Sequence, residues 1–281
     1  MTIDLHTHSA VSDGLDSPAE LMRLGAKAGL TVIGLTDHDT TAGWAEAGIA
    51  AQQHGIRLLR GAELSTTDAQ GGTVHMLAYL FDPTAPALSA KLAKAPQQRE
   101  DRLRAIVELL KPDFAVSFES IAERAGAGAM LGKPHIAAEL VAIGAVATPR
   151  DAFTEILADR SKYLVPLERM SPRTAVELVR EAGGVTVIAH PRDGGRGTGL
   201  SHDEIAELRD AGLFGLEVNH REHTDHARAE LTAIATDLGL RMTGSSDYHS
   251  TVKPNQLGEN VTRSEVLDEL VGSATSRMGL I

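Results

Sequence analysis

Histidine and carboxylate residues fall at short, regular spacings in this sequence. One residue separates His6 from His8, another separates Asp247 from His249, and residues 37–39 read Asp-His-Asp. Side chains on a strand alternate with period two, so His6 and His8 point the same way and are suited to chelating one ion. Mixed imidazole and carboxylate ligands favour Mn²⁺, Zn²⁺ or Fe²⁺. The pattern therefore predicts a site for divalent metal ions.

The elements that must position these residues are short apolar segments alternating with helical patterns. Strands are predicted at residues 3–8, 31–35, 57–63, 74–81, 185–190, 213–219 and 240–244. Between them lie helical patterns, the first of which begins with Ser17 as N-cap and Pro18 at the first helical position. This alternation predicts an α/β fold with a mostly parallel sheet closed into a barrel of about seven strands.

Most of these strands have a histidine or an acidic residue at one end. At the carboxyl ends of barrel strands such side chains face a common site, so residues distant in sequence are expected to meet. Each has an ordinary alternative by itself: Asp39 is suited to capping the next helix, and Glu63 to a solvated strand end. No single structural role explains the whole set.

The middle of the chain has a different character. From residue 86 to 163 the pattern is helical, with apolar residues at helical spacing and no convincing strand. We therefore expect a barrel formed by residues 1–85 and 164–281. Residues 86–163 are expected to form a helical insertion that acts as a lid and contributes to the substrate pocket.

Composition limits the possible partners. The 281 residues include 27 Lys and Arg against 38 Asp and Glu, a net charge of -11, which disfavours stable binding to duplex nucleic acid. The absence of cysteine excludes disulfides and thiolate metal sites. No signal peptide or membrane-spanning apolar run is visible, so we expect a cytoplasmic protein without membrane association. The oligomeric state is not predicted.

The motifs resemble those of the PHP (polymerase and histidinol phosphatase) family of metal-dependent phosphoesterases. The resemblance lies in residues 4–9 (DLHTHS) with 12–14 (SDG), 34–40 (GLTDHDT), 61–63 (GAE), 75–79 (HMLAY), 188–191 (IAHP) and 244–249 (GSSDYH). It implies a distorted (β/α)7 barrel. Within the family the chain looks similar to stand-alone members that dephosphorylate nucleotides and carry a helical insertion.

The resemblance also implies a set of metal ligands. The first metal position would be held by His6, His8, Glu63 and Asp247, and the second by Glu63, His75 and His190. The third would take Asp13, His38 and His249. Because some relatives have a histidine at the position of Asp13, two or three divalent ions per chain are expected.

Further residues are candidates for binding the substrate. Arg99, Lys133 and His135 of the insertion, together with Arg192, are predicted to hold a phosphate. His220 and His223 follow a predicted strand, and either one would be a general acid or part of a polar rim. Asp37 and Asp39 are expected to orient imidazoles.

These features predict a phosphomonoesterase that uses a metal-bridging hydroxide. The leading hypothesis is release of the 3′-phosphate of a nucleoside 3′,5′-bisphosphate, a small phosphorylated substrate, to give a 5′-nucleotide. Alternatives are a 5′-to-3′ exonuclease on short RNA and a histidinol-phosphate phosphatase. A non-enzymatic metal-binding regulatory module is an alternative of another class.

Overall fold

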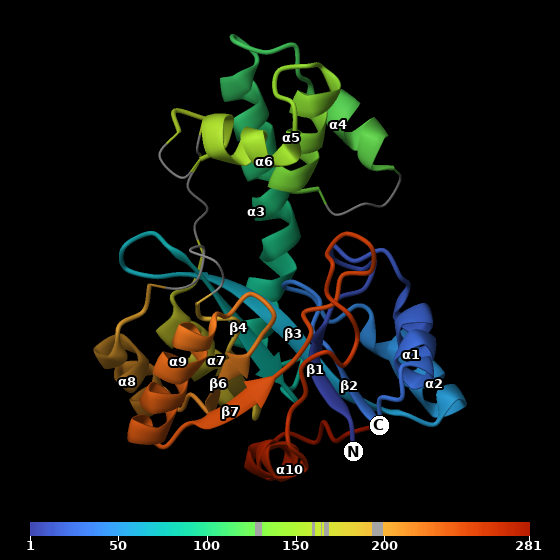
Figure 1. Ribbon diagram of the computed structural model, residues 1–281, viewed down its shortest axis with the longest axis vertical. Coiled ribbons are helices and arrows are strands. Elements are labelled where there is room, and N and C mark those ends of the chain that lie inside the picture. Colours follow the sequence, from blue (N-terminus) through green and yellow to red (C-terminus); the bar gives the residue numbers. More distant parts are fainter. Residues whose placement is uncertain (127–130, 159–160, 164, 166–168, 193–198) are drawn as a thin grey trace. The chain divides into compact units, whose positions relative to one another are not determined.

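A computed structural model describes residues 1–281 except 127–130, 159–160, 164, 166–168 and 193–198. It divides into two compact units, one formed by Met1–Leu92 with Arg169–Ile281 and the other by Ala93–Glu168. At the centre of the first unit is a seven-stranded sheet whose strands are neighbours in chain order (Figure 1). Its strands are β1 (Ile3–Thr7), β2 (Val32–Leu35), β3 (Arg57–Thr67), β4 (Thr73–Tyr79), β5 (Val185–Ile188), β6 (Gly215–Asn219) and β7 (Arg241–Gly244).

The sheet is parallel except at β4, which runs antiparallel to both β3 and β5. Its two edges meet at one end, where Thr7 and the segment after β7 form a parallel bridge through Tyr248. The Asp247 N–H also donates to the His6 carbonyl over 2.9 Å. The sheet therefore nearly closes on itself, and the predicted α/β barrel is confirmed, with one strand reversed.

Helices cover the outside of this barrel (Figure 1). The first helix begins at Pro18, as the sequence predicted. Ser17 is its N-cap, because the Ser17 hydroxyl accepts the N–H of Glu20. The alternative interpretation, in which Asp39 caps the next helix, is wrong, since that helix starts at Trp44 with Gly43 as its N-cap. The helices of this unit are α1 (Pro18–Lys27), α2 (Trp44–His54), α7 (Pro172–Glu181), α8 (His202–Ala211), α9 (Asp225–Leu238) and α10 (Ser264–Ser273).

Two apolar layers hold the barrel together. The buried residues of the inner layer are aliphatic apart from Tyr79, whose hydroxyl donates to the Leu5 carbonyl over 3.0 Å. The outer layer packs the helices onto the sheet through residues such as Leu21 and Leu231. Between β1 and β2 the backbones approach so closely that a Cβ on Gly34 would lie 2.2 Å from the Leu5 carbonyl oxygen. Gly34 thus fixes the strand that carries His6.

The second unit is helical and has its own apolar core, which includes Leu103, Ile136 and Tyr163. Its helices are α4 (Phe118–Ala125), α5 (Lys133–Ala142), α6 (Pro149–Asp151) and a π-helix (Ala152–Ile156), and α3 (Pro86–Leu110) contributes residues to both units. The predicted insertion boundary at residue 164 lies outside the described residues. The role of the insertion as a lid over the substrate stays a prediction.

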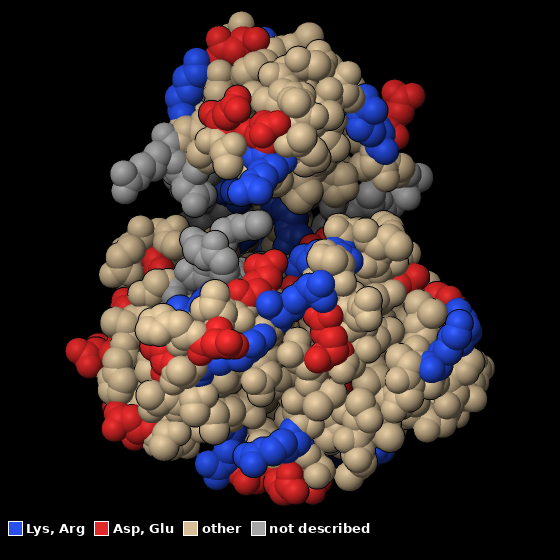
Figure 2. Space-filling view, in the orientation of Figure 1, with Lys and Arg blue, Asp and Glu red and all other residues tan. Residues whose placement is uncertain are grey.

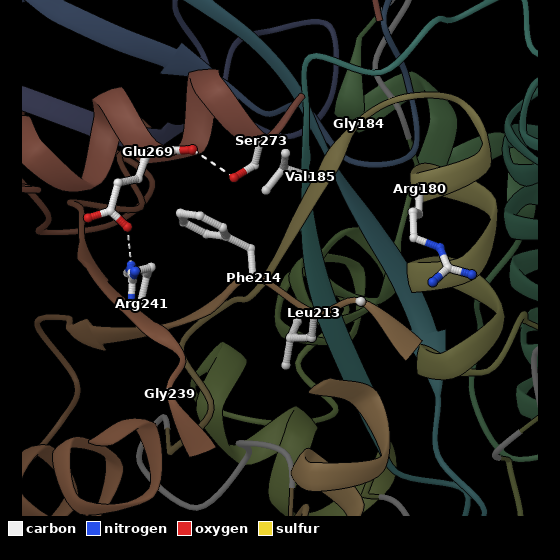
Figure 3. A pocket seen from close by; sticks show the side chains of 10 residues that line it. Arg180, Gly184, Val185, Leu213, Phe214, Gly239, Arg241, Glu269 and Ser273 are labelled. Carbon is white, nitrogen blue, oxygen red and sulfur yellow. Dashed lines mark hydrogen bonds and ion pairs between the residues drawn. The ribbon is translucent and has the colours of Figure 1, made fainter. Parts of the chain in front are cut away.

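A hollow of about 400 Å³ opens at the amino ends of β5, β6 and β7 (Figure 3). It is lined by Phe214 and Val185, and Arg241 at its edge is paired with Glu269 of α10. The predicted ligands His190, Asp247 and His249 follow the opposite ends of β5 and β7, so this hollow has no part in their site. Among the described residues, no helix is long and apolar enough to cross a membrane.

Substitution of Gly34 by Ala should destabilise the protein. The added Cβ would overlap the backbone of β1, which cannot move without breaking the sheet, so the free energy of unfolding should fall by about 3 kcal/mol. Gly272→Ala is the matched control, because a Cβ there meets nothing within 4 Å. That change in α10 should leave stability unchanged or raise it by up to about 1 kcal/mol. Denaturant unfolding of both variants measures the difference, and equal stabilities would contradict the packing argument.

Candidate metal centre

The carboxylate of Glu63 lies at the centre of the predicted site. Its side chain is only 1% exposed, at the carboxyl half of β3. The described residues bring five imidazoles within 3.3 Å of its oxygens: Nδ1 of His75 at 2.9 Å and Nε2 of His190 at 3.1 Å from Oε1, with Nε2 of His6 at 3.3 Å, Nε2 of His8 at 3.1 Å and Nδ1 of His38 at 3.2 Å from Oε2. One buried negative charge is thus surrounded by nitrogen ligands.

The other carboxylates extend this cluster in two directions. Asp247 Oδ1 lies 3.4 Å from His6 Nε2 and 3.3 Å from His8 Nε2. Asp13 Oδ1 lies 3.2 Å from His249 Nε2, while Asp13 Oδ2 lies 3.6 Å from His38 Nε2. Three sets of potential ligand atoms lie within 4.8 Å of one another: His6, His8, Glu63 and Asp247; His8, Asp13, His38 and His249; and His38, Glu63 and His75.

These sets closely resemble the grouping that the family implied. The set of four around Asp247 is identical to the implied first position. The set with Asp13 is the implied third position with His8 added. The set with His75 is the implied second position with His38 in place of His190, and His190 contacts Glu63 separately. All nine predicted ligands therefore come together from positions 6 to 249. That each of them binds an ion stays a prediction.

The reversed strand explains how His75 reaches this end of the barrel although it lies near the start of β4. In the antiparallel register His75 is opposite Ser65, just beyond Glu63 on β3, and its carbonyl accepts the Ala189 N–H over 3.0 Å.

The same end of the barrel contains strained backbone. Asp39, His190 and Asp247 have φ values of 54°, 26° and 53°, in a backbone region that residues other than glycine rarely adopt. Such strain is often found at functional sites.

Glu217 of β6 supports two of the ligands from behind. It is fully buried, its Oε1 lies 3.3 Å from His6 Nδ1, and its Oε2 accepts the His190 N–H over 2.7 Å. Burial alone would raise the pKa of Glu217, but the imidazoles of His6, His220 and His190 lower it to about 2. Sequence reasoning missed this residue. The available signal was an acidic side chain between Leu216 and Val218 in the strand predicted at residues 213–219.

Asp37 and Asp39 organise the backbone around the site. Asp37 accepts hydrogen bonds from the Ser9 N–H over 2.8 Å and from the Ser12 hydroxyl over 2.6 Å, which fixes the turn that carries Asp13. Asp39 Oδ1 accepts the Ser65 N–H over 2.8 Å. Through these bonds both carboxylates shape loops that bear predicted ligands.

The hydrogen bonds behind the imidazoles define which nitrogen faces the centre. His249 Nδ1 donates to the Asp247 carbonyl over 2.8 Å, so the lone pair of the neutral ring is on Nε2, which faces Asp13 Oδ1 at 3.2 Å. His6 Nδ1 is likewise engaged by Glu217, and its Nε2 points at His8 Nε2 over 3.0 Å. Two imidazole nitrogens this close require a shared proton or a cation near both. The donor set therefore fits divalent metal ions.

The electrostatics agree with this fit. Burial alone would lower the pKa of His8, but hydrogen bonds to Asp247 and Glu63, together with the charges of Glu63 and Asp13, raise it to about 9. The carboxylates thus stabilise positive charge beside His8, whether protons or metal cations provide it. Burial lowers the pKa of His38 and of His249 and keeps these imidazoles neutral, as metal ligation requires.

The structure separates the candidates His220 and His223. His223 is bound to the backbone at both nitrogens, with Nδ1 donating to the Val218 carbonyl over 2.8 Å and Nε2 accepting the Arg192 N–H over 3.2 Å. His220 is 1% exposed, and its Nε2 lies 3.7 Å from Asp247 Oδ2. His223 is therefore engaged in holding backbone, whereas His220 faces the centre.

The predicted phosphate-binding residues lie in several places. The Arg192 guanidinium contacts Glu230 over 3.0 Å and the Leu200 carbonyl over 3.1 Å. Arg99, Lys133 and His135 belong to the second unit, where Lys133 begins α5. Their contact with a substrate stays a prediction.

Lys253 is a basic residue at the centre that sequence reasoning missed. Its Nζ lies 2.6 Å from Asp247 Oδ2, on the loop after β7. A lysine in a loop carries no signal in sequence alone; only its position six residues after Asp247 could have drawn attention to it.

Comparison with known proteins agrees with this geometry. The sequence model of the PHP domain matches residues 4–146. The chain belongs to the PHP family, and the protein is a metal-dependent phosphoesterase, a hydrolase.

Individual relatives match over nearly the whole chain. A 3′,5′-nucleoside bisphosphate phosphatase of Chromobacterium violaceum is 34% identical over 94% of this chain and 92% of its own length. A 5′-3′ exoribonuclease of Haemophilus influenzae is 33% identical over 92% and 93%, respectively. A crystal structure from Bifidobacterium adolescentis, assigned as a metal-dependent phosphoesterase, has 37% identity and a TM-score of 0.88, covering 98% of this chain and 97% of that chain.

Replacing Glu217 by Gln should weaken metal binding. Residues that orient ligands from behind typically contribute about 10- to 100-fold to metal affinity, and the amide would remove the charge that holds His6. Glu207→Gln, at an exposed position on α8, is the matched control. Titration of Mn²⁺ into each metal-free variant measures the affinity. Equal affinities in the two variants would show that Glu217 has no such role.

Metal ions should also stabilise the fold. Ligands that bind only the folded state raise stability by about 2.7 kcal/mol at a hundredfold excess over the dissociation constant. The melting temperature of chelator-treated protein should therefore rise on addition of Mn²⁺ and fall again with excess chelator. The rise should be largely lost in Glu63→Gln, and an equal rise in that variant would place the bound ions elsewhere.

Proposed function

We propose that this protein removes the 3′-phosphate of nucleoside 3′,5′-bisphosphates and releases 5′-nucleotides. The observation that carries the proposal is the buried Glu63 carboxylate with five imidazoles around it, joined to Asp247 and Asp13. Such a cluster provides nitrogen and oxygen ligands for several cations at one point. The substrate class is supported by the likeness to the bisphosphate phosphatase over most of both chains.

The proposed ligands are the nine predicted residues, with Glu63 shared between neighbouring metal positions. We infer two or three ions per chain, chosen from Mn²⁺, Zn²⁺ or Fe²⁺. Asp13 is the ligand that differs in kind from the imidazoles around it, and its side chain is 42% exposed. The third position is therefore expected to be the weakest of the three.

When bound, divalent cations would neutralise phosphate charge and lower the pKa of a water molecule that attacks phosphorus. The residues of the chain supply the remaining parts of the mechanism. Glu63, Asp247 and the imidazoles form a rigid site. Glu217 contacts His6 and His190 from behind, and Asp37 binds the turn that carries Asp13. We propose that Arg99, Lys133 and His135 of the second unit bind the second phosphate of the substrate.

A second candidate is a 5′-to-3′ exonuclease on short RNA, favoured by the likeness to the exoribonuclease.

The charge distribution favours a small substrate over a long nucleic acid for either candidate. The net charge is -11, and acidic and basic side chains are interspersed on the visible face of each unit (Figure 2). A long polyanion would be repelled by such a surface, while a nucleotide or a short oligonucleotide would be repelled much less.

The test is phosphate release from adenosine 3′,5′-bisphosphate by manganese-loaded protein. We expect turnover that produces adenosine 5′-monophosphate, with His8→Ala at least about a thousandfold slower because a ligand of the proposed centre is lost. Oligonucleotides of increasing length distinguish the second candidate. Turnover that rises with chain length would favour the exonuclease, and no phosphate release above that of His8→Ala would refute the phosphatase.

A further inference from the structure

Two hydrogen-bond donors approach the outer oxygen of Asp247. The inner oxygen, Oδ1, faces His6 and His8 in the metal centre. The outer oxygen, Oδ2, accepts a hydrogen bond from Lys253 Nζ over 2.6 Å. His220 Nε2 lies 3.7 Å from the same oxygen, beyond hydrogen-bond distance. One carboxylate oxygen therefore has a partner in place and a second donor beside it.

The tautomer of the neutral His220 ring follows from its other nitrogen. Nδ1 accepts the Glu222 N–H over 3.3 Å, and therefore the proton of the neutral ring is on Nε2. This Nε2 is buried and has no hydrogen-bond partner in the part of the chain that is described. A buried donor left unsatisfied costs about 1–3 kcal/mol. His220 would thus gain a bond if Lys253 left Asp247.

Lys253 is able to leave. Its side chain is 38% exposed and ends a flexible four-carbon stem on the loop between β7 and α10. By contrast, the guanidinium of Arg192, the other basic candidate of the barrel unit, contacts Glu230 and two backbone carbonyls. Cations bound by Asp247 Oδ1 would neutralise this carboxylate and weaken its attraction for Lys253.

We propose that Lys253 is a substrate-binding residue that moves from Asp247 to a phosphate oxygen, and that His220 then donates to Asp247 in its place. The proposal rests on the phosphatase activity proposed above. The exchange leaves neither the carboxylate nor the imidazole without a partner. His220 is therefore a positioning residue, and Lys253 lets the barrel unit itself contribute a cation to phosphate binding.

Lys253→Met tests the first half of the proposal. Losing a hydrogen bond from a charged group should raise the KM for the bisphosphate by about 10- to 100-fold. The dissociation constant of inorganic phosphate, measured by calorimetry on manganese-loaded protein, should rise similarly. The bound metal should stay within about twofold of wild type, because His220 can donate to Asp247 in place of the lysine. Lys253→Arg should restore most of the phosphate affinity, and Lys27→Met, at an exposed lysine of α1, should change nothing.

A double-mutant cycle tests the second half. His220→Asn keeps a group that can accept the Glu222 N–H but lacks a donor that reaches Asp247, whereas His220→Gln retains a donor near the position of Nε2. Each single variant should bind Mn²⁺ almost normally. Lys253→Met combined with His220→Asn should lose metal affinity by at least about tenfold more than the two single effects together, and the combination with His220→Gln should not.

The contrary results are specific. Unchanged phosphate affinity in Lys253→Met would refute a substrate-binding role, and loss of metal in that single variant would show that Lys253 only supports Asp247. Additive effects in the cycle would refute the exchange with His220. Absence of bisphosphate turnover by wild type would refute the proposed substrate instead, while phosphate binding to wild type and Lys253→Met would still measure the role of the lysine.

Discussion

The burial of the Glu63 charge is the constraint on which the rest of the site depends. A carboxylate removed from water is costly unless cations or donors surround it. Here five imidazoles do so, and they come from β1, β4 and the segments that follow β1, β2 and β5. Such an arrangement requires several strands to end at one place, which a barrel achieves and an open sheet of the same strands does not.

The cost of this convergence is visible in the backbone. His190 and Asp247 adopt positive φ values just where the chain leaves β5 and β7, and both backbones are fixed by hydrogen bonds, to Glu217 and to His6 respectively. The close contact of Gly34 with β1 and the reversal of β4 serve the same end. Rigid elements thus hold the ligand atoms so that little reorganisation is needed when cations bind.

Positive charge is used locally in a protein that is acidic as a whole. The net charge is -11, yet the centre gathers imidazoles and Lys253 around three carboxylates. This distribution suits a small phosphorylated ligand. Its phosphate contacts the cationic groups of the centre at short range, whereas salt screens its repulsion by the more distant acidic surface. The pairing of Lys253 and His220 at one oxygen of Asp247 gives the site a donor that can be exchanged without exposing a buried charge.

The sequence by itself determined the α/β barrel class and most of the potential ligands, because strand-helix alternation and residues at strand ends are local signals. Asp13 came only from the resemblance to the PHP family. It could not determine that β4 is reversed, since His75 looks the same at the start of a parallel strand. Glu217, Lys253 and the difference between His220 and His223 were decided only by tertiary structure. Their roles depend on which atoms lie opposite them across the barrel, and those partners are distant in the chain.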